Sequence, residues 1–123
     1  MAKRVLVVDD SATVRQQVRA ALGSGDFLLM EAGDGTEGAE IINQFSDLAA
    51  VICDVNMPRM SGLDMVEAVK KDPKHTRLPI VMLTTEGQLE LVQRAKAAGA
   101  KGWIVKPFKP ELLLAAIRKL TAA

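Results

Sequence analysis

The sequence is poor in the residues that build disulfide frameworks and cysteine or histidine metal sites. Its 123 residues include one cysteine, Cys53, and one histidine, His75. A single cysteine excludes an internal disulfide and any site made of several cysteines, and it is compatible with a reducing compartment. Cys53 lies in an apolar run and alternates with Asp54, so we predict a buried, inert thiol. His75 stands in a polar stretch, and we predict a solvated loop residue there.

Charge bias and long apolar runs are also missing. Sixteen Lys and Arg residues against fifteen Asp and Glu residues leave a formal charge of +1, which gives no electrostatic argument for nucleic acid or a membrane surface. No stretch approaches the roughly 20 apolar residues of a membrane span. The first four residues lead straight into a short apolar run, unlike a signal peptide. We therefore expect a soluble, cytoplasmic protein that binds neither nucleic acid nor membrane.

The chain shows no internal repeat, low-complexity tract or flexible linker. A length of 123 residues with 49% hydrophobic content suits one domain with one core. We expect residues 1–123 to form a single domain, with no effector domain attached.

Short apolar runs alternate five times with segments of helical periodicity. The expected strands are residues 5–8, 27–32, 50–53, 78–83 and 102–105. The expected helices are residues 11–22 and 36–45, a third from 61 until Pro73, a fourth ending near 98, and 110–120. Parallel neighbours need crossover connections, so this alternation predicts an α/β fold whose parallel sheet carries helices on both faces. The alternation alone leaves the strand order open.

Polar residues follow four of these strands. They are Asp9 and Asp10, Asp54, Thr84 and Lys106. The carboxyl ends of parallel strands share one edge of a sheet, so we expect these side chains to converge on one site. Three carboxylates there would repel one another unless a cation offsets them.

The chemistry of this predicted site favours a hard metal ion and a phosphoryl group. Oxygen donors without histidine or cysteine indicate Mg²⁺. A lysine and a hydroxyl beside the metal suit a phosphoryl group that is attached to, or passes onto, a carboxylate.

These site residues and their flanking positions resemble the signature of a known family. Asp9-Asp10, Asp54 with Pro58 and Gly62 beyond it, Thr84, and Lys106-Pro107-Phe108 resemble the receiver-domain signature of bacterial response regulators. The match spans essentially the whole chain. It implies a flavodoxin-like (CheY-like) sheet of five parallel strands in the order 2-1-3-4-5, with five helices on both faces.

The resemblance implies a role for each site residue. Asp54 would accept the phosphoryl group, Thr84 would bond it and Lys106 would pair with it. The Lys106-Pro107 peptide bond is expected to be cis. Such a domain catalyses its own phosphorylation and dephosphorylation but turns over no metabolite, so it is not expected to be an enzyme.

By the same resemblance, a metal ion would be held close to Asp54. Asp10, Asp54 and the backbone carbonyl of Asn56 would bind Mg²⁺, with Mn²⁺ as a substitute, and Asp9 would assist through water. Asn56 and Glu86 stand at the two variable positions that tune phosphoryl lifetime in receivers, and we predict fast resetting. Thr85, bulkier than the residue that often follows Thr84 in the family, is expected to narrow access to Asp54.

Within the family, residues 84–88 and 98–108 look most similar to stand-alone chemotaxis-type CheY proteins. This implies a chemotaxis histidine kinase as phosphodonor and a flagellar motor or other motility component as target. It also implies a monomer that signals through its fourth helix, fifth strand and fifth helix. Trp103 stands where receivers usually place Tyr or Phe, so it would switch together with Thr84. Arg15 and Arg19 are expected on a solvated face that shares in kinase docking.

Other functions compete with this one. A Mg²⁺-dependent phosphohydrolase of the haloacid dehalogenase type would use Asp54 as nucleophile, but it should carry a second acid where Asn56 stands, and a cap insertion. A mononucleotide-binding module is disfavoured because Asp9 and Asp10 would repel phosphate. A single-domain receiver in a phosphorelay outside chemotaxis is the alternative. A receiver that serves only as a scaffold is disfavoured, because the acidic set is intact.

Overall fold

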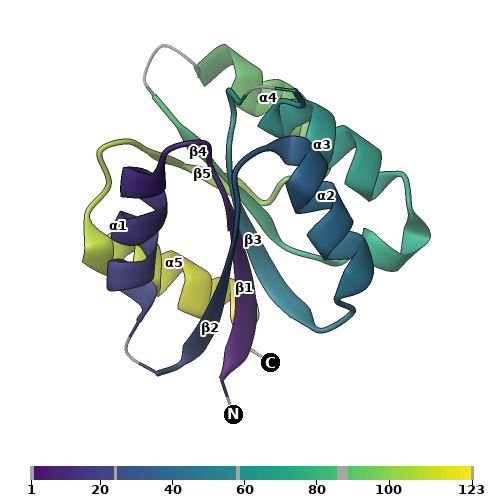
Figure 1. The fold of residues 1–123 in the computed structure, drawn as a ribbon. Helices are drawn as coiled ribbons and strands as arrows, with labels where there is room; N and C mark the ends of the chain where they lie inside the picture. Colours follow the sequence, from purple (N-terminus) through teal and green to yellow (C-terminus); the bar gives the residue numbers. More distant parts are fainter. Residues whose placement is uncertain (1, 24, 58, 86–88, 123) are drawn as a thin grey trace.

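A computed structural model describes residues 2–23, 25–57, 59–85 and 89–122 of the chain (Figure 1). Over these residues, strands and helices alternate as the apolar periodicity predicts. The elements are β1 Lys3–Val8, α1 Ala12–Leu22, β2 Phe27–Ala32, α2 Gly35–Gln44, β3 Leu48–Asp54, α3 Gly62–Lys70, the short 3₁₀ helix η1 Pro73–His75, β4 Ile80–Thr84, α4 Leu89–Ala98, β5 Gly102–Val105 and α5 Pro110–Thr121.

The five strands form one parallel sheet in the order β2-β1-β3-β4-β5, which confirms the predicted order. The register aligns the strand ends, since Val8 of β1 pairs with Cys53 of β3, and Asp54 pairs with Leu83 of β4. Thr84 pairs in turn with Val105 of β5. The polar residues at or just after these ends therefore share one edge of the sheet, as parallel pairing requires.

Helices cover both faces of the sheet, with α1 and α5 on one side and α2, α3 and α4 on the other (Figure 1). Alternate strand residues point to opposite faces, so two separate cores form. Leu6, Cys53 and Met82 pack under α2, α3 and α4. Val7 and Ile52 pack with Leu113 and Ile117 under α1 and α5. The apolar strand runs are buried on both sides, as expected for a parallel sheet.

Side-chain caps fix where three helices begin. The hydroxyl oxygen of Ser11 accepts a hydrogen bond from the Val14 amide at α1, and the hydroxyl oxygen of Ser61 accepts one from the Asp64 amide at α3. Asp34 caps α2 in the same way. These caps satisfy amide groups that have no partner inside the helix. The elements that start beside the sheet edge are therefore held at defined positions.

The segment before β4 differs from the prediction in two respects. The strand begins at Ile80 instead of residue 78. The Leu78 carbonyl accepts a hydrogen bond from the Lys70 ammonium at 2.6 Å, and Pro79 has no amide to donate to a neighbouring strand. His75 was wrongly predicted to be solvated: η1 turns it inward, it is buried, and its Nε2 lies 3.0 Å from Asn43 Oδ1.

No helix within the described part of the chain is long and apolar enough to cross a membrane. The cytoplasmic location stays a prediction.

Candidate functional site

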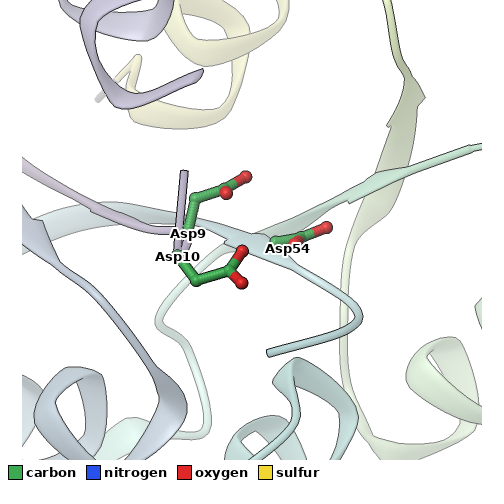
Figure 2. A group of neighbouring side chains, drawn as sticks. All are labelled: Asp9, Asp10 and Asp54. Atoms are coloured by element: carbon green, nitrogen blue, oxygen red, sulfur yellow. The ribbon is translucent and has the colours of Figure 1, made fainter. Parts of the chain in front are cut away.

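Three carboxylates gather where β1 and β3 end. One oxygen each from Asp9, Asp10 and Asp54 lies within 4.8 Å of the other two (Figure 2). Asp9 is fully buried and Asp54 is 6% exposed, whereas Asp10 is open to solvent. The fold thus brings together acids that stand 45 residues apart in the sequence, on one sheet edge.

The buried Asp9 is held from several sides. Its Oδ1 accepts a hydrogen bond from the Ser11 amide at 2.8 Å, at the start of α1. Its backbone carbonyl accepts one from the Arg15 guanidinium, which also bonds Glu31 Oε1 at 2.9 Å. The Arg15 side chain is 21% exposed, so it is only partly solvated on the face where it was predicted. Arg19, half exposed, pairs with Glu31 as well.

Lys106 bridges the two buried acids. Its Nζ lies 3.0 Å from Asp54 Oδ1 and 3.2 Å from Asp9 Oδ2. The Lys106 amide donates to the Thr84 carbonyl at 2.7 Å, and the following Lys106-Pro107 peptide bond is cis, as predicted. A cation thus sits between two carboxylates that would otherwise repel each other in a buried setting.

The pKa values of this pair reflect burial and charge together. Burial raises the pKa of Asp54 above its usual value, the hydrogen bond from Lys106 opposes that rise, and the charge of Asp9 adds to it. Burial alone would lower the pKa of Lys106, but its hydrogen bond to Asp54 and the charges of Asp54 and Asp9 raise it. Lys106 is therefore charged at neutral pH.

Thr84 ends β4 beside this pair. The residue is fully buried, and its Oγ1 has no hydrogen-bond partner within the described part of the chain. A buried hydroxyl without a partner is costly and uncommon. It is therefore a donor available to a group arriving at the site. Thr85, next to it, is exposed.

The loop after Asp54 is closed tightly around the strand end. The Val55 amide donates to Asp54 Oδ1 at 2.9 Å, and the Gly62 amide donates to the Val55 carbonyl at 2.8 Å. A Cβ added to Gly62 would lie 1.8 Å from the Asp54 carbonyl oxygen. Only glycine fits this close approach.

Cys53 supports the strand end from the opposite face. It is fully buried, as predicted. Burial, with added effects from the charges of Asp54 and Asp9, raises the pKa of its thiol far above the usual value. The sulfur is therefore a packing group.

Trp103 lies on the outward face of β5. The residue is 40% exposed, and the Lys96 ammonium of α4 stands 4.1 Å from the centre of its ring. An indole with a cation over its face gains a favourable electrostatic contact. The ring is therefore held outward here.

Of the residues expected to tune resetting, the structure describes Asn56 but not Glu86. Asn56 is exposed on the loop two residues beyond Asp54. Glu86 lies outside the described residues, as does Pro58.

The sequence reading missed one ion pair beside the site. Asp34, buried at the start of α2, bonds the Arg59 guanidinium from the loop after β3. The spacing of Asp34 and Glu37 resembles a capping box and predicts the cap, but no local pattern predicts a partner 25 residues away.

The donor set fits a hard divalent cation and a phosphoryl group. Carboxylate oxygens from two strand ends are the ligands that Mg²⁺ prefers, and such sites commonly take one or two carboxylates. Lys106 and Thr84 both stand at this edge, since the Lys106 amide bonds the Thr84 carbonyl, and an ammonium and a hydroxyl can meet the oxygens of an anion. Asp54, whose Oδ1 accepts bonds from Lys106 and from the Val55 amide, is the candidate nucleophile.

Known proteins resemble this chain in sequence and in fold. The family of response regulator receiver domains matches residues 5–118 of the chain. The chain is 42% identical over 113 residues to chemotaxis protein CheY1 of Helicobacter pylori, covering 89% of this chain and 90% of that protein. It is 33% identical over 123 residues to chemotaxis protein CheY of Thermotoga maritima, covering 98% and 99%.

A solved structure agrees with these sequence relatives. Chemotaxis response regulator CheY4 of Vibrio cholerae superposes with a TM-score of 0.89 at 40% identity, covering 98% of this chain and 99% of that one. The chain belongs to the family of response regulator receiver domains, the signalling modules of two-component systems.

Proposed function

We propose that the protein is a phosphorylation-operated switch in which Asp54 takes a phosphoryl group from a histidine kinase with the help of Mg²⁺. The observation that carries the proposal is the contact of Asp54 with Lys106 at 3.0 Å inside a cluster of three acids. The domain is proposed to act as a monomer.

The first step uses the Asp54 carboxylate as nucleophile. One of its oxygens attacks phosphorus in line with the departing histidine nitrogen, so an oxygen–phosphorus bond forms as the nitrogen–phosphorus bond breaks. The leaving imidazole then takes up a proton. Catalysis in such a transfer is mostly positioning and charge neutralisation. The hydrogen bond from the Val55 amide to Asp54 Oδ1 helps to fix the carboxylate for this attack.

Lys106 and Thr84 receive the new group. The Lys106 ammonium pairs with a phosphoryl oxygen in place of the Asp54 oxygen that has been esterified. The Thr84 hydroxyl, which lacks a described partner, donates to another phosphoryl oxygen. Both interactions strengthen as negative charge builds at the strand end.

Asp10, Asp54 and the Asn56 carbonyl would hold Mg²⁺, or Mn²⁺ in its place, and Asp9 would assist through water. When bound, the ion neutralises phosphoryl oxygens. Asp9 is oriented by the Ser11 amide, so the acids present their oxygens without rearrangement of β1. The later reset, attack of water on phosphorus, is tuned by Asn56, Thr85 and Glu86.

The output surface is formed by α4, β5 and α5. Movement of Thr84 toward the phosphoryl group leaves space that Trp103 fills by turning inward from its present outward position. Trp103 and Leu112, which are 40% and 61% exposed, place apolar surface on β5 and α5. Such surface is typical of a docking site for a protein target.

Chemotaxis is the proposed setting. The relatives named above carry chemotaxis names and match nearly their full length. We therefore expect a chemotaxis histidine kinase as phosphodonor and a flagellar motor or other motility component as target, with no role in binding nucleic acid or membrane.

Beryllofluoride and acetyl phosphate test the switch. Each is added to wild type and to Asp54→Ala with and without Mg²⁺, while Trp103 fluorescence is recorded. A fluorescence change that needs both Mg²⁺ and Asp54 supports the proposal. Sustained turnover of phosphate monoesters would favour a hydrolase. If neither protein responds, the remaining interpretation is a receiver that serves only as a scaffold.

A further inference from the structure

Two loops from different parts of the chain are joined beside the acidic cluster. One connects β2 to α2, and the other connects β3 to α3 and carries Asn56. The Gly35 amide donates to the Met60 carbonyl at 3.1 Å. A Cβ on Gly35 would lie 2.6 Å from that same oxygen. The two backbones are therefore in direct contact.

An ion pair crosses the same junction. Nε of Arg59 lies 2.9 Å from Asp34 Oδ2, and Nη2 bonds that oxygen as well. The Asp34 side chain is 11% exposed, and its other oxygen accepts from the Glu37 amide at 3.0 Å. The Glu37 amide, with the Arg59 guanidinium second, holds the pKa of Asp34 below its usual value. Asp34 is thus a fixed, ionised anchor.

Arg59 adopts a backbone conformation that side chains other than glycine rarely take. Its φ is 65°, in the left-handed region that costs an ordinary residue on the order of 1 kcal/mol or more. Such a conformation persists where surrounding contacts hold it. Here the bonds from Arg59 to Asp34 and the neighbouring bond between Gly35 and Met60 hold it.

Among the described residues of this loop, the other backbone hydrogen bonds lie near its ends. Val55 donates to Leu83 at one side, and Gly62 donates to Val55 at the other. Between them lies Asn56, whose carbonyl is a proposed metal ligand. When a loop samples several conformations, its apparent affinity for a ligand falls with the fraction of molecules that hold the binding conformation.

We propose that the Asp34–Arg59 pair, together with the Gly35–Met60 hydrogen bond, latches the loop after Asp54 in its metal-binding conformation. Asp34 and Arg59 are positioning residues: neither touches the phosphoryl group, and both act through the backbone at Asn56. This inference rests on the proposed function, since it assigns them to the same Mg²⁺ site.

Two variants separate the latch from other roles of these residues. Asp34→Asn keeps an oxygen to cap α2, because Asn is as good a cap as Asp, but it removes the charge that Arg59 needs. Arg59→Asn keeps a residue that tolerates positive φ and removes the guanidinium. Arg59→Lys retains the charge without the two-pronged geometry. Glu67→Gln is the matched control, since it breaks the exposed ion pair to Arg94 on α3 and α4.

Mg²⁺ binding is measured by titrating MgCl₂ and following the amide resonances of Asp10 and Asn56 in ¹⁵N-labelled protein. We expect Asp34→Asn and Arg59→Asn each to weaken binding about two- to fivefold, the range set by partly exposed ion pairs. The double variant should lose no more than either single one, because the pair acts as a unit. Arg59→Lys should recover part of the affinity, and Glu67→Gln should match wild type.

Hydrogen exchange in metal-free protein gives a second readout. The Gly35 amide should exchange faster than in wild type in both latch variants, Asp34→Asn and Arg59→Asn. Its exchange rate should be unchanged in Glu67→Gln. The latch variants could instead unfold at lower urea concentration and still bind Mg²⁺ as wild type does. That result would show a purely structural role for the pair, and it would overturn this inference while leaving the proposed function intact. Wild type that shows no Mg²⁺-dependent shift would overturn the proposed function and this inference with it.

Discussion

Gly62 gives the sharpest test of the geometry around the strand end. Replacing it with alanine adds a Cβ that would lie 1.8 Å from the Asp54 carbonyl oxygen and 2.9 Å from both the Asp54 carbonyl carbon and Cys53 Sγ. A carbon and an oxygen in contact normally stand about 3.3 Å apart. The backbone of α3 or of Asp54 must therefore move by roughly 1.5 Å, by this difference.

Neither side can move freely. Asp54 is paired with β4, and Gly62 is tied to the Val55 carbonyl at 2.8 Å. Overpacking a core usually costs about 1–3 kcal/mol, and a clash between backbones belongs at or above the upper end. We expect Gly62→Ala to lower the free energy of unfolding by about 3 kcal/mol or more, out of the roughly 5–15 kcal/mol of a typical domain.

Gly33→Ala is the matched control, because a Cβ there meets no atom within 4 Å and the backbone has an ordinary φ. We expect it to stay within about 0.5 kcal/mol of wild type. Equilibrium urea unfolding, followed by Trp103 fluorescence and circular dichroism, measures both. Wild-type stability in Gly62→Ala would show that the close approach is misplaced and would refute the reasoning.

Three other perturbations follow from the structure. Burial raises the pKa of Asp54 above its ordinary 3.8, so the native state holds this proton more tightly than the unfolded chain. The free energy of unfolding should then fall as pH rises between 3.8 and the raised native value. Asp54→Asn should flatten that part of a pH series of urea melts, and an unchanged slope would assign it to other groups. Lys96→Met removes the cation over Trp103. An exposed contact of this kind is worth about 0.5–1 kcal/mol, so its loss should shift the equilibrium between the outward and inward positions of the ring about two- to fivefold toward the inward one. Acrylamide quenching of Trp103 should decrease, with Lys119→Met as control, and equal quenching in both variants would count against the contact. Iodoacetamide should modify the buried Cys53 only as fast as the protein opens, whereas rapid labelling of native protein would contradict its burial.

The sequence was most informative where a local pattern coincides with a topological rule. Apolar runs located the strands, and parallel pairing then required Asp9, Asp54, Thr84 and Lys106 to meet at one edge. The structure brings the side chains of Asp9, Asp54 and Lys106 together, and it places Thr84 at the same edge through its backbone bond to Lys106. Their chemical roles stay predictions until they are tested.

The wrong prediction for His75 has a physical cause. His75 is a polar residue in a polar stretch, for which solvation is the ordinary expectation. It is instead buried, with its ring beside Asn43 of α2. Arg15, which is partly exposed, likewise bonds Glu31 and the Asp9 carbonyl. Burial of a polar side chain depends on such a tertiary partner, and periodicity along one element carries no information about it.

The start of β4 shows the same limit on a smaller scale. Residue 78 is apolar and precedes a buried run, so it was assigned to the strand. The Lys70 ammonium, from α3, bonds the carbonyls of His75, Thr76 and Leu78. The Leu78 carbonyl thus bonds the side chain of Lys70, eight residues earlier, instead of a neighbouring strand.

The central claim is that Asp54 accepts a phosphoryl group in a reaction that needs Mg²⁺. The most direct measurement is mass spectrometry of the intact protein after incubation with acetyl phosphate, followed by mapping of the modified residue. We predict one added phosphoryl group, on Asp54, that appears with Mg²⁺, is absent when the metal is chelated, and is lost in Asp54→Asn. A phosphoryl group on another residue, or none on wild type with Mg²⁺ present, would contradict the account.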